Sequence, residues 1–402
     1  MSISARRILL CCLCCAIPFF GSSPSHAETI RIGVSGPFSG GSKPMGESML
    51  NGIRLATDEI NAIGGINGKP IELVVRDDEA SPELGARIAD ELTRSKVVAT
   101  IGIVNTGVGL ASIDIYQKAR IPLMIAVSTG SSLTRKYAPP AAAENYIFRV
   151  SPSLDLEAKA VAADLRRKGL STVAILADAT AYGEAGLKAF LEQAKSNGIR
   201  VVSEERFKIG DQDMSAQMRR ARATDAQAIV VWGIGPELAA IAHNKDALGW
   251  KVPLLGSWTL SMRNFIEMAG KAGEHALMPQ TFIQDATSTT KTGFLLAYQR
   301  NFKTELIPSP MSAAQGYDGM RLLYLALRQG NSTDGSKIRE AFENLGSRYQ
   351  GVITSYSKPF SRQDHDAITE NMLLMGQVVG GRVDYAYADD WKRSGLLRLK
   401  GQ

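Results

Sequence analysis

The amino-acid sequence predicts an α/β protein with two lobes, each built on a parallel sheet that helices cover. Strand-like and helix-like segments alternate from Ile30 to about Trp258, and this alternation is typical of parallel sheets with helices on both faces. A second series of similar size begins after Phe148–Pro152. The 402 residues, of which 45% are apolar, exceed a comfortable single core and therefore indicate about two domains.

The first series opens with a strand-like run, Ile30–Val34. Apolar side chains at helical spacing then predict a long helix: Met49, Ile53, Ala56, Ile60 and Ile63. Gly64 and Gly65 end this helix, because glycine readily adopts the left-handed conformation that stops a helix. Ser81 and Pro82 open the next helix as its cap and first-turn proline. Further strands are expected at 71–75, 97–103 and 121–127.

The second series repeats the pattern and then changes. Its expected strands are 172–176, 200–207 and 228–232, and its expected helices are 184–197 and 214–223. In the last third we expect helices near 292–302, 317–328 and 336–345, then a hairpin of 372–379 and 383–387 around Gly380-Gly381. No glycine-serine tract separates the two series, so we expect strands rather than a flexible tether to join the lobes.

The N-terminus has the features of a cleavable export signal. Arg6 and Arg7 precede an apolar run over Ile8–Phe20, and Ser25–Ala27 supplies the small residues of a cleavage site. The run is too short to span a bilayer. We therefore expect residues 1–27 to be a signal peptide and the mature protein to be periplasmic. A twin-arginine signal is the alternative interpretation of the two arginines.

Cysteine usage and charge exclude several functions. All four cysteines lie inside the apolar run of the signal, so the mature chain has no thiol for catalysis, a disulfide or a metal. Removal of the signal lowers the formal net charge of +6 by two, and the remaining charges of both signs are interspersed. That pattern is typical of a solvated surface, and we expect no nucleic-acid partner.

The sequence also lacks the motifs of an enzyme. The mature chain has the histidines His243, His275 and His365, at spacings that no zinc site uses, and it has no serine-centred nucleophile elbow. Asp364-His365-Asp366 resembles a metal motif in isolation, but we interpret it as a solvated polar loop. We therefore expect a binding protein without cofactor or metal.

Five segments follow one another along the mature chain: Ile60–Gly68, Asp77-Asp78, Gly102–Tyr116, Leu123–Thr134 and Tyr182-Gly183-Glu184. In this order they resemble the leucine/isoleucine/valine-binding protein family, the periplasmic solute receptors of ABC importers. The resemblance implies two Rossmann-like lobes joined by a three-crossover hinge, the type I periplasmic binding protein fold. On this basis we expect lobe 1 at 28–147 plus 282–354 and lobe 2 at 148–281 plus 355–402.

The resemblance and helix physics both indicate Thr106 and Gly107 as ligand contacts. They start a helix after a buried strand, where unpaired amides can receive an anion. The position of Thr106 carries a serine in the family, whose hydroxyl and neighbouring amides hold the ligand carboxylate. Val127, Ser128 and Thr129 match a second segment on the carboxylate side. Without the resemblance, Thr106 is interpreted as a helix cap, and Ser128 and Thr129 are interpreted as residues that form turns.

The second lobe supplies the residues expected against the body of the ligand. Tyr182 matches a tyrosine that packs over bound ligand in the family. Trp258 occupies the position of the acid that pairs with a ligand's amino group, and Met45 occupies the position of a tyrosine in the first loop. We expect Trp258, Tyr182, Phe38 and Met45 to form the walls of the pocket.

The tryptophan at position 258 changes the ligand that the resemblance implies. A buried ammonium without a carboxylate is costly, so Trp258 argues against a free amino acid and favours a carboxylate with an apolar or aromatic body. The alternative is that Asp178, Asp318 or Glu237 supplies the acid. Asp318 is the first candidate among them, although it could instead cap the helix that follows.

These observations predict a monomeric receptor without enzymatic activity. It would bind one small carboxylate-bearing solute, with aromatic and other organic acids among the candidates, and present it to an inner-membrane ABC permease. Two alternatives stay open: a genuine receptor for branched-chain amino acids, and a ligand sensor for a signalling partner. A sensor is an alternative because lobe closure can be read by any partner surface.

Overall fold

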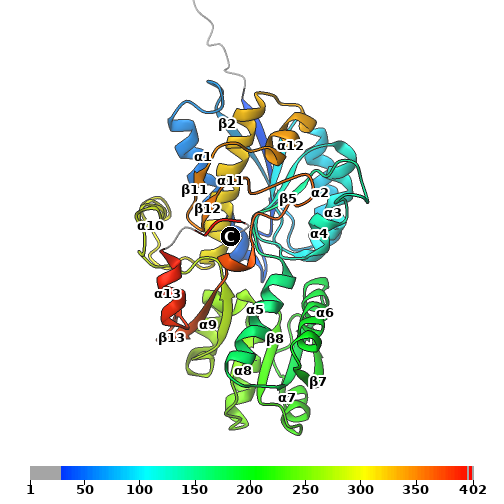
Figure 1. Cartoon of the computed structure of the whole chain (residues 1–402), viewed down its shortest axis with the longest axis vertical. Helices are drawn as coiled ribbons and strands as arrows, with labels where there is room; N and C mark the ends of the chain where they lie inside the picture. Colours follow the sequence, from blue (N-terminus) through cyan, green and yellow to red (C-terminus); the bar gives the residue numbers. More distant parts are fainter. Residues whose placement is uncertain (1–28, 396–397, 401–402) are drawn as a thin grey trace, which may run out of the picture.

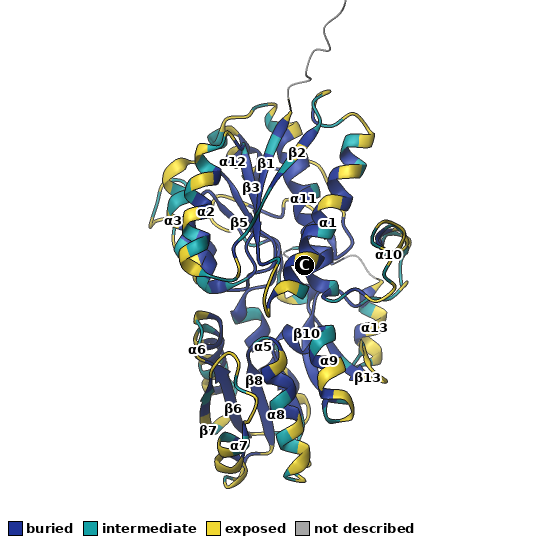
Figure 2. Ribbon diagram, turned by 180° about the vertical axis from the view of Figure 1, so that it is seen from behind, coloured by how far each residue is buried: buried dark blue, intermediate teal, exposed yellow. Residues whose placement is uncertain are grey.

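The computed structural model describes residues 29–395 and 398–400, and the predicted signal peptide lies outside the described residues. Two lobes follow each other along the long axis, with lobe 1 in the upper half of Figure 1 and lobe 2 in the lower half. In each lobe the central strands are buried and the outer faces of the helices are exposed (Figure 2). The predicted α/β class with two lobes is confirmed.

Lobe 1 contains a five-stranded parallel sheet in the order β2-β1-β3-β4-β5. Its strands are β1 (Ile30–Gly36), β2 (Ile71–Asp77), β3 (Ala99–Gly102), β4 (Leu123–Ile125) and β5 (Ile147–Arg149). The strand order reverses between β1 and β3. Ligands of open α/β sheets bind beyond the carboxyl ends of the strands at such a switch point.

Four long helices cover the sheet of lobe 1. They are α1 (Lys43–Ala62), α2 (Pro82–Arg94), α3 (Thr106–Ala119) and α11 (Pro310–Gly330). α1 and α11 pack together through Gly52 and Gly316, and a Cβ added to Gly52 would lie 2.0 Å from the carbonyl oxygen of Ala313. Gly64 and Gly65 have positive φ, as the predicted end of α1 requires. Ile63, predicted on the buried face of this helix, is 69% exposed because α1 ends one residue earlier.

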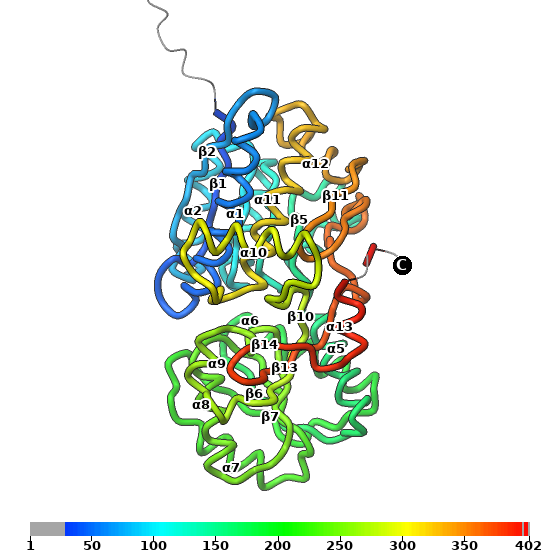
Figure 3. Tube along the Cα trace, turned by 90° about the vertical axis from the view of Figure 1, so that its left-hand side faces the viewer, coloured from blue at the N-terminus to red at the C-terminus, as the bar shows by residue number. Residues whose placement is uncertain are grey.

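Five further elements complete the described part of lobe 1. They are α4 (Ser132–Arg135), α10 (Thr289–Phe302), α12 (Gly335–Glu343), β11 (Tyr349–Gln350) and β12 (Ser355–Tyr356). Figure 3 shows α10 against the lower part of lobe 1. Phe294 and Tyr298 of α10 join the apolar core that contains α1 and α11.

Lobe 2 contains a seven-stranded mixed sheet in the order β14-β13-β10-β9-β8-β6-β7. Its strands are β6 (Thr172–Asp178), β7 (Arg200–Phe207), β8 (Ala228–Trp232), β9 (Leu254–Gly256), β10 (Leu277–Gln280), β13 (Leu374–Val379) and β14 (Arg382–Tyr385). β13 and β14 run antiparallel and form the predicted hairpin. The order reverses between β6 and β8, so lobe 2 has a switch point of its own.

The helices of lobe 2 divide between the two faces of its sheet. They are α5 (Leu154–Arg167), α6 (Ala181–Ser196), α7 (Ser215–Arg222), α8 (Pro236–Ala247), α9 (Arg263–Ala269) and α13 (Ala388–Ser394). One apolar cluster joins α5 and α6 to the sheet, and another joins α7, α8 and α9 to it. A short 3₁₀ helix, Trp258–Ser261, follows β9.

The described chain passes between the two sheets three times, after β5, after β10 and before β13. Two predicted boundaries need correction. The first crossing follows Arg149 and not residue 147, because β5 pairs with β4 up to that residue. The third crossing comes later than residue 355. Phe360 and Ile368 still pack in the core of lobe 1, and Asp366 forms a parallel bridge with Arg149.

Candidate functional site

The two lobes contact each other where α3 and α6 begin. A Cβ added to Gly107, at the start of α3, would lie 3.9 Å from the Cβ of Ala181, at the start of α6. Both helices follow strands that flank the switch points of their sheets. The residues at these helix starts and strand ends therefore face one region between the lobes.

Thr106 and Ser128 are brought together on the lobe 1 side of this region. Both are buried, and Thr106 Oγ1 lies 3.3 Å from Ser128 Oγ. Thr106 is the first residue of α3 and not its cap, because Asn105 holds the cap position and donates its side-chain amide to Ser42 Oγ at 3.1 Å. The hydroxyl of Thr106 is thus turned toward the neighbouring strand end rather than toward its own helix.

The segment after β4 is held in place by backbone contacts. Ser128 N donates to the carbonyl of Ile103 at 3.0 Å, and the carbonyl of Thr129 accepts from Leu154 N at 2.7 Å. Val127 is buried in the apolar core. Thr129 is buried as well, and its side chain lies close enough to Glu157 to lower the pKa of that carboxyl.

Tyr182 and Trp258 come from lobe 2 and are both buried. Tyr182 lies in the first turn of α6, where its N–H donates to the cap Thr180 Oγ1 at 3.2 Å. Burial raises the pKa of the Tyr182 hydroxyl, and the nearby Ser257 and Thr259 side chains oppose that rise. Trp258 belongs to the apolar cluster that forms the core of lobe 1. Whether these two residues contact a ligand stays a prediction.

Met45 and Phe38 lie at the first switch point. Met45 is buried in the same apolar cluster as Trp258, and half-buried Phe38 packs against that cluster. Phe38 N donates to Asp77 Oδ1 at 2.8 Å, which fixes the loop between β1 and α1. Their role as walls of a ligand pocket stays a prediction.

Glu157 is a residue of this region that the sequence analysis missed. It lies in the first turn of α5, it is fully buried, and its Oε2 accepts a hydrogen bond from Trp258 N at 3.3 Å. The helical spacing of the sequence could have indicated Glu157. Glu157 shares a helical face with the buried residues Leu154, Ala158 and Val161, and an acid on such a face is unusual without a partner or a role.

Burial raises the pKa of Glu157 to about 8, even though the hydrogen bond from Trp258 N favours the ionised form. Arg149, at the end of β5, opposes the rise with its positive charge. At neutral pH the carboxyl therefore holds its proton for most of the time unless a cation arrives.

We expect Glu157 to make the ligand-free protein less stable as pH rises. Its ordinary value of 4.5 is raised to about 8 on folding, so the folded state keeps a proton that the unfolded state releases. The stabilisation by Glu157 is complete below pH 4.5, its ordinary pKa, and it is lost as pH rises through about 8, its pKa in the folded protein. Thermal unfolding across this range should show a falling Tm and a shallower fall in Glu157→Gln. Because other buried carboxyls titrate as well, the difference between the two proteins is the measurement; equal slopes would contradict the assignment.

The structure corrects the prediction for Asp318. Its carboxylate accepts four hydrogen bonds within lobe 1: from Val352 N at 2.9 Å, Ile353 N at 3.0 Å, Tyr356 Oη at 3.0 Å and Tyr349 Oη at 3.2 Å. These bonds satisfy both oxygens and attach the segment 349–356 to α11. Asp318 is therefore an internal anchor and not a ligand contact.

The other two acids considered form hydrogen bonds within their own lobe. Asp178 Oδ1 accepts from Thr180 N at 2.9 Å and from Gly183 N at 3.2 Å, which orders the start of α6, while its Oδ2 is buried without a partner among the described residues. Glu237 Oε1 accepts from Gly210 N at 2.6 Å. Of the acids in this part of the structure, Glu157 is the one that contacts Trp258.

Asp364-His365-Asp366 is not the solvated loop that we predicted. His365 is buried, stacks on Phe148, and its Nδ1 lies 3.0 Å from the carbonyl oxygen of Ile147. Asp366 forms a two-pronged ion pair with Arg149, at 3.0 Å from Nε and 2.7 Å from Nη2. The segment packs along β5, and the side chains of His365 and Asp366 form hydrogen bonds and an ion pair with that strand.

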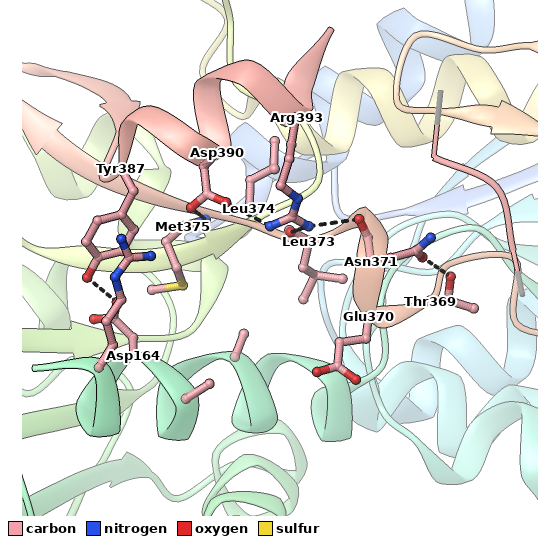
Figure 4. A pocket seen from close by; sticks show the side chains of 13 residues that line it. Asp164, Thr369, Glu370, Asn371, Leu373, Leu374, Met375, Tyr387, Asp390 and Arg393 are labelled. Atoms are coloured by element: carbon pink, nitrogen blue, oxygen red, sulfur yellow. Dashed lines mark hydrogen bonds and ion pairs between the residues drawn. The ribbon is translucent and has the colours of Figure 1, made fainter. Parts of the chain in front are cut away.

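A cavity of about 630 Å³ lies beside the hinge, between α5, residues 369–375 and α13 (Figure 4). Arg393 of α13 donates to the carbonyls of Asn371 at 3.0 Å and Leu373 at 3.1 Å, and Tyr387 donates to Asp164. The residues that line it include none of the predicted ligand contacts. One wall is the third crossing, so we interpret this cavity as part of the hinge.

Within the described residues, 29–395 and 398–400, no three side chains of His, Cys, Asp or Glu lie close enough together to hold a metal ion. No helix there has the length and apolar character that a membrane crossing needs.

Comparison with known proteins gives consistent matches. A family model described as periplasmic binding protein matches residues 29–382. The leucine-, isoleucine-, valine-, threonine-, and alanine-binding protein of Pseudomonas aeruginosa is 24% identical over 354 residues, which are 85% of this chain and 91% of that protein. A periplasmic binding protein type 1 from Bordetella pertussis has a TM-score of 0.81 at 27% identity, with 89% of this chain and 99% of that chain covered.

One further structure shares the fold. A solute-binding protein of an ABC transporter from Rhodopseudomonas palustris, solved in complex with 3,4-dihydroxy benzoic acid, has a TM-score of 0.75 at 21% identity. The match covers 88% of this chain and 95% of that chain. At this identity the likeness concerns the fold alone.

Proposed function

Because this chain belongs to the periplasmic binding protein family that includes the leucine-, isoleucine- and valine-binding proteins, we propose that it binds one small carboxylate-bearing solute between its lobes and delivers it to an inner-membrane ABC permease. One solved relative, from Streptococcus pneumoniae, is a substrate-binding protein of a branched-chain amino acid transporter, and this likeness supports a transport role without catalysis. The ligand class and the permease are the parts that go beyond the family match.

The observation that carries the proposal is the group of buried hydroxyls at the start of α3. Thr106 Oγ1 and Ser128 Oγ lie 3.3 Å apart, and the next residue, Thr129, is buried too. Hydroxyls and the free amides of a helix start are donors to which a carboxylate binds well, and the helix dipole adds to this attraction.

The lobe contact supports a closure mechanism. Gly107 of lobe 1 and Ala181 of lobe 2 lie next to each other, and the predicted ligand contacts are buried around this point. A ligand that touches Thr106 and Ser128 on one side and Tyr182 and Trp258 on the other stabilises the state in which the lobes meet. The permease would then recognise that closed state.

Thr129→Ala tests the carboxylate end. We expect it to weaken every carboxylate ligand by about 1–2 kcal/mol, the scale of a lost hydrogen bond to a charged group. Isothermal titration calorimetry on the purified mature protein measures the change, after refolding to remove carried-over ligand. Unchanged affinity would remove Thr129 from the site.

A matched control is Thr57→Ala. Thr57 is also buried, but its Oγ1 donates to the carbonyl of Ile53 within α1 at 2.8 Å. It should leave ligand affinity unchanged. The ligands for both titrations come from a thermal-shift screen of amino acids and of aliphatic and aromatic carboxylates, because a ligand that binds the folded state raises Tm.

A further inference from the structure

The third crossing is the longest of the three connections between the lobes of the described chain. In the first, β5 ends at Arg149 and α5 begins at Leu154, and in the second, Phe282 packs in lobe 1 two residues after the end of β10. The third runs from Tyr356, the end of β12, to Leu374, the start of β13. A hinge needs only a few residues that change their backbone angles. A connection of this length must therefore be fixed along most of its course if the lobes are to keep a defined angle.

Residues 398–400, which we call the clasp, lie across this crossing. Arg398 is 6% exposed, and its guanidinium donates to the carbonyl of Met372 at 2.7 Å and to the carbonyl of Ile353 at 3.1 Å. Ile353 is anchored in lobe 1, because its N–H donates to Asp318 of α11 at 3.0 Å. Met372 lies two residues before β13. Arg398 therefore ties the last turn before the sheet of lobe 2 to the core of lobe 1.

The other two residues of the clasp bond the middle of the crossing. Lys400 Nζ donates to the carbonyl of Pro359 at 2.8 Å and to the carbonyl of Asp366. The carbonyl of Leu399 accepts from the side-chain amide of Asn371 at 2.9 Å. Three successive residues thus hold the crossing at points spread along its length.

Arg398 is a buried cation whose partners are backbone carbonyls. Its Nε has no partner among the described residues, and within 29–395 and 398–400 no acid forms an ion pair with it. Burial lowers its pKa to about 10, and the positive charge of Arg393 contributes to this fall. A buried cation without an acid destabilises a fold, so stability alone does not account for this arginine. A link between the separate segments that carry Ile353 and Met372 does account for it.

Lobe 2 holds the same stretch from its own side. Arg393 of α13 donates through Nη2 to the carbonyls of Asn371 and Leu373, at one wall of the cavity beside the hinge (Figure 4). Met372, which the clasp holds, lies between these two residues. The attachments of lobe 1 and lobe 2 to the third crossing therefore meet directly before β13.

We propose that the clasp fixes the third crossing to lobe 1 as far as Met372, so that lobe 2 turns about the residues directly before β13 and the ligand-free protein keeps a narrow range of angles between its lobes. This inference goes beyond the proposed function and does not depend on the ligand. Without the clasp, the long crossing bends at other places as well, and the range of angles widens.

Distances between two spin labels test the range of angles. α3 and α6 both begin at the contact between the lobes, so the distance between their far ends changes when the lobes turn. Lys118→Cys and Lys195→Cys place the labels at these exposed ends. A protein expressed from Glu28 onward has no cysteine of its own, so labelling is specific. We expect double electron–electron resonance on the ligand-free protein to give one narrow distance distribution, and Arg398→Met and Lys400→Met to broaden it.

Two control variants separate the clasp from general effects of mutation. Gly52→Ala crowds the contact between α1 and α11, and it should leave the distance distribution narrow although it lowers stability. Arg222→Met removes an arginine that donates to the carbonyl of Leu248 within lobe 2. It should also leave the distribution narrow, because neither residue lies at a crossing.

Hydrogen exchange locates the change along the chain. The amides of Met372 and Leu373 donate to the carbonyls of Thr369 and Glu370, each at 3.0 Å. In Arg398→Met we expect the amides of residues 359–373 to exchange about tenfold faster, the scale of one lost hydrogen bond to a charged group. The lobe 2 strands β6 and β8 should exchange at an unchanged rate.

The possible outcomes decide the proposal without a ligand. Unchanged distances in both clasp variants overturn it, even if exchange becomes faster, because the clasp would then only pack the crossing. A broad distribution in the unmutated ligand-free protein also overturns it. If Arg398→Met does not fold, Lys400→Met decides, since Lys400 is half-buried and its loss is milder. Because no step uses a ligand, failure of the proposed function and failure of this inference are separate results.

Discussion

Replacing Arg149 by methionine is expected to lower the free energy of unfolding by about 3–5 kcal/mol, the usual cost of breaking a buried ion pair on one side. The Arg149 side chain is 0% exposed and that of Asp366 is 17% exposed. Burial by itself raises the pKa of Asp366, but Arg149 outweighs it and holds that pKa below its ordinary value. Without Arg149, the carboxylate of Asp366 would remain mostly buried without its cationic partner.

Replacing Arg149 should also affect the predicted ligand contacts, because Arg149 bonds to the loop that carries them. Arg149 Nη1 donates to the carbonyl of Gly130 at 2.8 Å, directly after Ser128 and Thr129. Its backbone N–H donates to the carbonyl of His365, and its own carbonyl accepts from Ala367 N, both at 2.9 Å. Arg149 therefore connects the loop after β4 to the third crossing.

A double-mutant cycle in urea measures this effect. Arg149→Met, Asp366→Asn and the double variant should give a double variant more stable than the sum of the single losses, because a neutral pair leaves no unbalanced charge. Additive losses would mean that the two side chains do not act as a pair. Ligand titration of the double variant then reports whether the contact to Gly130 matters for binding.

Gly52→Ala is expected to lower the free energy of unfolding by about 1–3 kcal/mol through overpacking. The added Cβ would lie 2.0 Å from the carbonyl oxygen of Ala313 and 2.9 Å from Tyr317 N, so α1 and α11 would have to move apart. The reverse contact is as tight, since a Cβ on Gly316 would lie 2.3 Å from the carbonyl oxygen of Met49. The two backbones approach closely because glycine stands on both helices.

Gly293→Ala provides the matched control in urea denaturation. Gly293 lies inside α10, and a Cβ added there meets nothing within 4 Å. Alanine should leave stability unchanged or raise it by about 0.4–1 kcal/mol, because it reduces the freedom of the unfolded chain. If Gly52→Ala left the free energy of unfolding as unchanged as Gly293→Ala, that result would contradict the close approach of α1 and α11 at Gly52.

Much of the fold was predictable from local patterns. The strands at 200–207 and 228–232 have the predicted bounds. A continuous apolar run marks the second of them, Ala228–Trp232. The helix α11 was predicted to start at Tyr317, but it starts at Pro310. Its first two turns are small and polar residues that are buried by contact with other elements, so they carry no amphipathic pattern.

The candidate site divides in the same way. Thr106, Ser128, Tyr182 and Trp258 were predicted from their positions shortly after strands, because the carboxyl ends of parallel strands share an edge. Asp318 had an equally suggestive position. The segment 349–356 wraps around it and takes up both oxygens, and the sequence holds no sign of that long-range contact.

Short-range periodicity and turn chemistry are enough to predict the α/β class, the two series of strands and helices and the helix starts that follow the strands. Which buried acids form hydrogen bonds inside the protein depends on the packed fold. Hydrogen-bond partners for a buried carboxyl come from elements far apart in the chain: Glu157 meets Trp258 from another part of lobe 2, while Asp366 meets Arg149 across more than half of the chain. Burial sets the charge of such groups, and burial is a property of the packed molecule.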